Sequence, residues 1–157
     1  MCHLNAFIIL LAVVLSLRTA RAQPTKAITG RILSDRLEGV PKAQICAQDT
    51  TVIGTTDMEG YFKLAVPVNT NTLLVRTVGM EWATVNLSGD CSNLEVILLY
   101  ASTYDFMSVR RVNRQEFRRF KHLPHLHQQA YEKGLFKSRI PCATPIFTKW
   151  VPRSANR

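Results

Sequence analysis

The fold class is decided by the stretch TVIGTTDMEGYFKLAV, residues 51–66. Phe62, Leu64 and Val66 alternate with polar or small side chains, which is typical of a β-strand with one buried face. The four residues Asp57–Gly60 carry Asp at the first position and Gly at the fourth, as a type I turn prefers. The stretch therefore predicts two strands, before and after this turn, joined as a hairpin.

The same pattern continues on both sides of this stretch. Further short strands are predicted at residues 27–33, 43–48, 73–79, 83–87 and 94–100. No long amphipathic helix separates them, so the βαβ units of a parallel sheet are excluded. The chain is therefore predicted to be mainly β, with a seven-stranded antiparallel β-sandwich over residues 23–100. Within the second of these strands, we expect Cys46 on the outward face.

The order of several short motifs resembles the carboxypeptidase-like regulatory domain family. These motifs are ITGRI at 28–32, GVPKAQI at 39–45, GTTDMEGYF at 54–62, VP at 66–67 and VGM at 78–80. The resemblance implies a transthyretin-like (prealbumin-like) sandwich, found in exported proteins of Bacteroidota and at the front of TonB-dependent receptors. It implies a fold rather than an activity, because one fold can serve many functions.

Residues 1–22 have the composition of a secretory signal peptide. Ala6–Leu17 is an uncharged, mostly apolar run, shorter than the roughly 20 residues that cross a bilayer. Ala20-Arg21-Ala22 has the form of a signal peptidase site. We expect cleavage before Gln23, export to the periplasm or the outer membrane, and no transmembrane span in the mature chain. An uncleaved anchor is the alternative, because the leading residues lack Lys and Arg.

Residues 101–157 form a basic C-terminal extension. They contain twelve Lys and Arg against three Asp and Glu, whereas residues 23–100 contain six against eight. Two short helices are predicted in the extension, at about 114–123 and 125–133. A capping-box variant begins at Asn113, Pro124 separates the two helices, and a glycine ends the second.

Three interpretations of this extension remain open. Its aromatic side chains pack on the sandwich while the arginines are solvated, or it docks an envelope protein, or it binds an anionic lipid or polysaccharide surface. The candidate partner-binding residues are Arg110, Arg111, Arg114, Arg118 and Arg119. We expect no nucleic acid as a partner, because an exported chain rarely meets it. We also expect the sandwich to fold without residues 102–157.

The sequence offers no set of residues for catalysis or for metal binding. His122, His125 and His127 are the histidines of the mature chain, and none has the His-x-x-Glu spacing of zinc carboxypeptidases. We interpret them as surface histidines at a corner between two helices. No catalytic residue, cofactor or metal is therefore expected.

Three cysteines remain after signal cleavage, an odd number for an oxidising compartment. They are Cys46, Cys91 and Cys142. A disulfide between Cys91 and Cys142 would tie the extension to the sandwich and contribute about 4 kcal/mol on the chain-entropy model. Another pairing, or three free thiols, is the alternative.

Together these features predict a non-enzymatic, exported, envelope-associated interaction or scaffold module. Its partner is expected to be an envelope protein or an anionic surface. The alternative is a carbohydrate- or glycan-binding sandwich, in which Trp82 and Trp150, with Tyr61 and Tyr100, supply flat faces. Burial of Trp82 inside the sandwich would count against this alternative.

Overall fold

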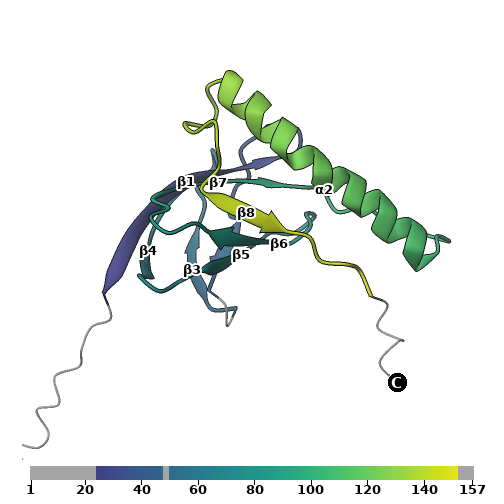
Figure 1. Ribbon diagram of the computed structural model, residues 1–157, viewed down its shortest axis with the longest axis horizontal. Helices are drawn as coiled ribbons and strands as arrows, with labels where there is room; N and C mark the ends of the chain where they lie inside the picture. The colour runs from purple at the N-terminus through teal and green to yellow at the C-terminus, as the bar shows by residue number, and fades with distance from the viewer. Residues whose placement is uncertain (1–23, 48–49, 152–157) are drawn as a thin grey trace, which may run out of the picture.

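The computed structural model describes residues 24–47 and 50–151 of the 157-residue chain. Two β-sheets face each other, and one helix lies across the outer side of the smaller sheet (Figure 1). The predicted signal peptide, residues 1–22, lies outside the described residues. Within the part that is described, no helix is both long and apolar enough to cross a membrane.

The smaller sheet has β1 (Thr25–Ser34) at its centre, between β4 (Tyr61–Pro67) and β7 (Asn93–Leu98). β1 pairs antiparallel with β4 but parallel with β7, so the prediction of a purely antiparallel sandwich is wrong at this pair. Parallel neighbours require a long connection. Here the connection includes strands β2 to β6, most of which form the opposite sheet.

The larger sheet contains five strands and includes one from the extension. In spatial order these are β3 (Val52–Thr55), β2 (Gln44–Cys46), β5 (Thr72–Arg76), β6 (Ala83–Leu87) and β8 (Ala143–Ile146). β8 pairs antiparallel with β6 at the sheet edge. The described residues therefore form eight strands rather than the seven that were predicted.

The turn at Asp57–Gly60 is present, but it does not close a hairpin. The side-chain Oδ1 of Asp57 accepts hydrogen bonds from the backbone N–H groups of Glu59 and Tyr61, at 3.0 and 2.7 Å. β3 and β4, on either side of the turn, belong to different sheets. The predicted hairpin is therefore wrong, because side-chain alternation indicates which face of a strand is buried and not which strand lies beside it.

The main core lies between the two sheets and is built from alternate residues of their strands. The smaller sheet contributes Ile28, Ile32, Phe62, Leu64, Val66, Leu94 and Val96, and the larger contributes Ile45, Leu73, Val75 and Val85. Cys46 is also fully buried, contrary to the prediction. The register of β2 against β3 shifts between Ile45 and Cys46, and such an irregularity breaks the alternation of inward and outward side chains.

A single helix, α2 (Val109–Glu132), takes the place of the two predicted helices. Pro124 lies inside it at an exposed position, although proline lacks the backbone N–H and usually breaks a helix. Leu123 and Ala130, before and after this proline, pack in one cluster with Leu33 and Ile97 of the smaller sheet. This shared contact holds both halves of α2 against the same surface.

The chain beyond α2 folds back onto the helix and the sandwich. Asn113, predicted as a helix cap, instead accepts a hydrogen bond from the N–H of Trp150 and donates one to its carbonyl, at 2.7 and 3.0 Å. Phe136 and Ala143 are buried, and Ala143 belongs to the main core. The extension is thus part of the folded unit, so removing residues 102–157 would remove core contacts, and folding of the sandwich without them stays a prediction.

Candidate functional site

Helix α2 has two faces of opposite character. The inner face carries Val112, Leu123, His127 and Ala130, all buried. The outer face, which we call the basic face, carries the exposed residues Arg110, Arg111, Arg114, Arg118, Lys121, His122 and His125. Residues three or four apart lie on one side of a helix. A single continuous helix therefore aligns charges that a corner between two helices would have separated.

Four of the five candidate arginines lie on the basic face. No ion pair in residues 24–47 and 50–151 involves Arg110, Arg111, Arg114 or Arg118. Exposed charges of this kind act over roughly 10 Å at an ionic strength of about 0.1 M. These four guanidinium groups are therefore available to a partner with negative charge.

Arg119, the fifth candidate, points the other way and is used inside the molecule. Its guanidinium group forms ion pairs with Glu81 at 2.5 Å and Asp35 at 3.6 Å, and it donates a hydrogen bond to the carbonyl of Tyr100 at 2.6 Å. Burial raises the pKa of Glu81, and the attraction of Arg119 offsets this effect only in part. Arg119 thus fastens α2 to the sandwich and is separated by the structure from the other four.

The three histidines are divided between the two faces of α2. The rings of His122 and His125 lie on the basic face with centroids 4.9 Å apart, whereas His127 is buried. The prediction of three surface histidines is therefore wrong for His127, because the helix continues through Pro124. Over the described ranges, no three His, Cys, Asp or Glu side chains are grouped so that they would hold a metal ion.

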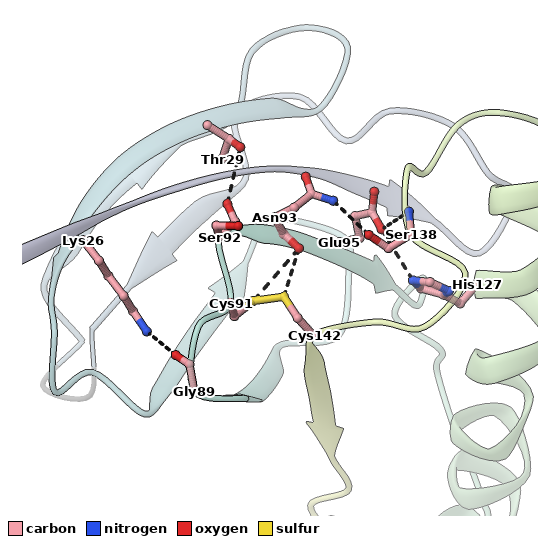
Figure 2. The surroundings of a disulfide bond; sticks show 10 residues. All are labelled: Lys26, Thr29, Gly89, Cys91, Ser92, Asn93, Glu95, His127, Ser138 and Cys142. Carbon is pink, nitrogen blue, oxygen red and sulfur yellow. Dashed lines mark hydrogen bonds and ion pairs between the residues drawn. A yellow bond between two sulfur atoms is a disulfide. The ribbon is translucent and has the colours of Figure 1, made fainter.

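A buried carboxylate on β7, which the sequence analysis did not single out, lies beneath the helix. Glu95 accepts a hydrogen bond from the backbone N–H group of Lys137 at 2.5 Å. It accepts another from the backbone N–H group of Ser138 at 3.2 Å, and its Oε2 atom lies 3.8 Å from Nε2 of His127 (Figure 2). The available signal was an acidic residue inside an otherwise apolar run. The sequence did not show that α2 covers this side of the strand.

Burial favours the neutral form of the His127 imidazole. Burial lowers its pKa, and the nearby carboxylate of Glu95 and the backbone of Arg139 offset this effect only in part. The ring is therefore neutral near pH 7, given an ordinary histidine pKa of about 6.5. Within residues 24–47 and 50–151, its Nε2 atom has no hydrogen-bond partner.

The structure brings Cys91 and Cys142 together as a disulfide (Figure 2). Their Cα atoms lie 5.3 Å apart, and 51 positions separate them in the sequence. Cys142 directly precedes β8, so the bond fixes the returning chain beside the turn that leads into β7. Cys46, the remaining cysteine of the described residues, is buried and unbonded.

Of the four aromatic residues of the glycan alternative, Tyr61, Trp82 and Trp150 are exposed and Tyr100 is half-buried. Trp82 is 62% exposed and Trp150 is 47% exposed, so the burial that would have counted against this alternative is not found. The guanidinium group of Arg76 lies over the ring of Trp82 at 5.2 Å, and other arginines lie over the rings of Tyr61 and Tyr100. One face of each of these three rings is thus occupied.

A protein family model matches the part of the chain that forms β1 to β7 and stops where helix α2 begins. The family model of the CarboxypepD_reg-like domain matches residues 28–109. This range contains β1 to β7 apart from the first residues of β1, and it ends at the first residue of α2. No curated protein is significantly similar to the chain. The basic face, Cys142 and β8 all lie beyond the matched range.

Proposed function

The chain belongs to the CarboxypepD_reg-like domain family, whose members are generally non-catalytic β-sandwich modules, and we propose that it is an exported interaction module of the cell envelope. In this proposal the sandwich, of the transthyretin-like type, is a scaffold that presents helix α2. The basic face of α2 docks an acidic envelope protein. Export, the periplasmic or outer-membrane location and the partner are parts of the proposal.

One observation carries this proposal, namely the division of the arginines of α2. Arg119 is neutralised by Glu81 and Asp35 of the sandwich, whereas four arginines on the basic face have no such partner in the described residues. If the arginines served only to hold the helix, the sandwich would be expected to offer carboxylates to them as well. Their outward position supports a partner outside this chain.

The basic face is also held rigidly, which favours binding. Phe147 packs against Phe117 and Phe120, with ring centroids 5.0 and 5.4 Å apart, and so fixes the N-terminal half of α2. The disulfide fixes the chain that returns from its C-terminal end. A surface that is already ordered loses less conformational entropy when it binds. Phe117 and Trp150, about 40–47% exposed beside the arginines, are of the aromatic kind that dominates binding hot spots.

A site-specific photo-crosslinker tests the proposal in the cells that produce the protein. Gln115 is exposed and lies between Arg111 and Arg118 on the helix surface, whereas Met58 is exposed on a turn of the sandwich. We expect a crosslinker at position 115 to capture one acidic envelope protein and a crosslinker at position 58 to capture none of it. Equal capture from both positions, or none from position 115, would contradict the proposal.

A glycan-binding sandwich is the second candidate, because Trp82 is 62% exposed. The two candidates differ in the effect of the Trp82→Ala substitution. Docking through the basic face requires that this variant still captures the same protein from position 115. Glycan binding requires that the variant loses retention on envelope polysaccharide while the wild-type chain is retained.

A further inference from the structure

A cavity of about 510 Å³ lies beneath α2, on the opposite side of the helix from most of the basic face. It is half open to solvent, and its lining comes from the helix around Pro124, from β7 and from the returning segment 139–145, several of whose residues are exposed. Its apolar walls include Val85, Val96, Phe120, Leu123, Ile140 and Ala143. Small-molecule sites typically measure roughly 300–1,000 Å³, so this cavity has room for a ligand.

One buried polar atom of a residue that lines this cavity has no hydrogen-bond partner among the described residues. His127 lines the cavity and is 6% exposed, and its Nε2 atom is buried without a hydrogen bond. Glu95 also lines the cavity, and both of its carboxylate oxygens already accept backbone hydrogen bonds. Leaving a buried polar atom unpaired is costly. A bridging water would satisfy Nε2 but would not fill the apolar volume around it.

We propose that this cavity binds a neutral alcohol with an apolar body, whose hydroxyl group meets Nε2 of His127. A hydroxyl group both donates and accepts hydrogen bonds, so it can pair with Nε2 in either tautomer of the imidazole. With Nε2 as the acceptor, the hydroxyl group donates to it. With Nε2 protonated, the hydroxyl group accepts from it and can donate to the carboxylate of Glu95, 3.8 Å from Nε2.

Charged head groups fit this cavity less well. A ligand carboxylate at Nε2 would lie beside the negative charge of Glu95. A ligand ammonium group would lie near the positive charges of Lys121 and Arg139, which also line the cavity, on a chain with a formal net charge of +9. The electrostatics thus favour an uncharged head group over either ion.

Calorimetric titration of the chain with matched small molecules tests this inference. The probes are decanol, methyl nonyl ether, decanoate and decylamine, which have similar apolar parts and different head groups. We expect decanol to bind at one site, about tenfold more tightly than the ether, because the ether cannot donate the hydrogen bond. Decanoate and decylamine should both bind more weakly than decanol. Absence of decanol binding, or tighter binding of any other probe, would overturn the proposal.

Two pairs of variants locate the binding. Gln128 lines the cavity from an exposed position on α2, whereas Gln115 is exposed on the same helix and lies outside the cavity. Gln128→Trp should weaken decanol binding at least tenfold and Gln115→Trp should leave it unchanged. His127→Phe should abolish the preference for decanol over the ether, and His127→Gln should retain it. Unchanged binding in Gln128→Trp, or an unchanged preference in His127→Phe, would contradict the assignment.

Discussion

At the scale of single residues, Gly60 combines a left-handed backbone conformation with a crowded position. Its φ is +83°, and a Cβ atom there would lie 2.3 Å from the carbonyl oxygen of Ile32 and 2.9 Å from the nitrogen of Val40. Gly79 has a similar φ of +79° but has no atom within 4 Å of the same position. The two glycines therefore separate the effect of backbone conformation from the effect of crowding.

We expect Gly79→Ala to lower the free energy of unfolding by about 1 kcal/mol, the cost of an L-residue in the left-handed region. Gly60→Ala should lower it by about 3 kcal/mol or more, because the crowded backbone must also move. Chemical denaturation of both variants measures the difference. Equal losses at the two positions would show that crowding at Gly60 does not matter.

His127 makes stability depend on pH. Its pKa is lowered in the folded protein by burial, so the unfolded chain binds a proton more readily than the folded one. The stabilisation is then fully present above the unfolded pKa of about 6.5 and is lost as the pH falls through the lower folded pKa. We expect the wild type to lose more stability than His127→Gln on acidification through this window.

Comparison of the two proteins at each pH removes other titrations from this test. Glu81 and Glu116 have raised pKa values, for which burial is the main cause. Their contribution to stability has the opposite sign, because it is lost as the pH rises. Both carboxylates are present in the wild type and in the variant, so their effects cancel in the difference. Parallel pH profiles for the two proteins would contradict the assignment to His127.

The arginines show how far single residues could be understood from the sequence. Arg118 and Arg119 are adjacent and chemically identical, so the sequence alone predicts the same binding role for both. Only the position of α2 over the sandwich brings Arg119 to Glu81 while Arg118 faces solvent. That distinction depends on contacts between residues 38 positions apart in the sequence, which no local pattern contains.

At the scale of elements, α2 shows tertiary packing overriding a local signal. Pro124 removes one backbone hydrogen bond, and proline is about 3 kcal/mol less favourable than alanine inside a helix. We expect Pro124→Ala to raise the free energy of unfolding by roughly 1–3 kcal/mol. Gln115→Ala, at another exposed position of α2, is the control and should change it by less than about 0.5 kcal/mol. Thermal unfolding measures both, and a loss of stability in Pro124→Ala would show that the proline ring contributes packing.

The positions of the strands along the chain were easier to predict than their pairing within the sheets. Alternation of apolar side chains located the segment now called β4 within one residue of its observed end, and all seven predicted strands have counterparts. The parallel pairing of β1 with β7 could not be predicted from the sequence. The alternation of side chains along a strand is the same whether its neighbour runs parallel or antiparallel. β8 was also missed, since four residues that include Pro145 have no clear strand pattern.

At the scale of the whole molecule, charge is divided as the sequence analysis described. The basic extension supplies nearly all the excess positive charge, and the structure gathers seven of its basic or titratable side chains on the outer face of one helix. The division of charge was readable from composition. The folding of the extension into the core was not, because it rests on the contacts of buried residues such as Phe136 and Ala143.

The proposed docking through the basic face is tested most directly by the salt dependence of the association rate with the partner captured from position 115. One variant replaces Arg110, Arg111, Arg114 and Arg118 by Gln, and its control replaces the exposed Lys63, Lys133, Lys137 and Lys149 by Gln, which changes the net charge equally. Electrostatic steering depends on where charge lies. We expect the arginine variant to associate slowly and with little salt dependence, at unchanged thermal stability, while the lysine variant resembles the wild type. Equal effects of the two variants, or unaltered association of the arginine variant, would contradict the account.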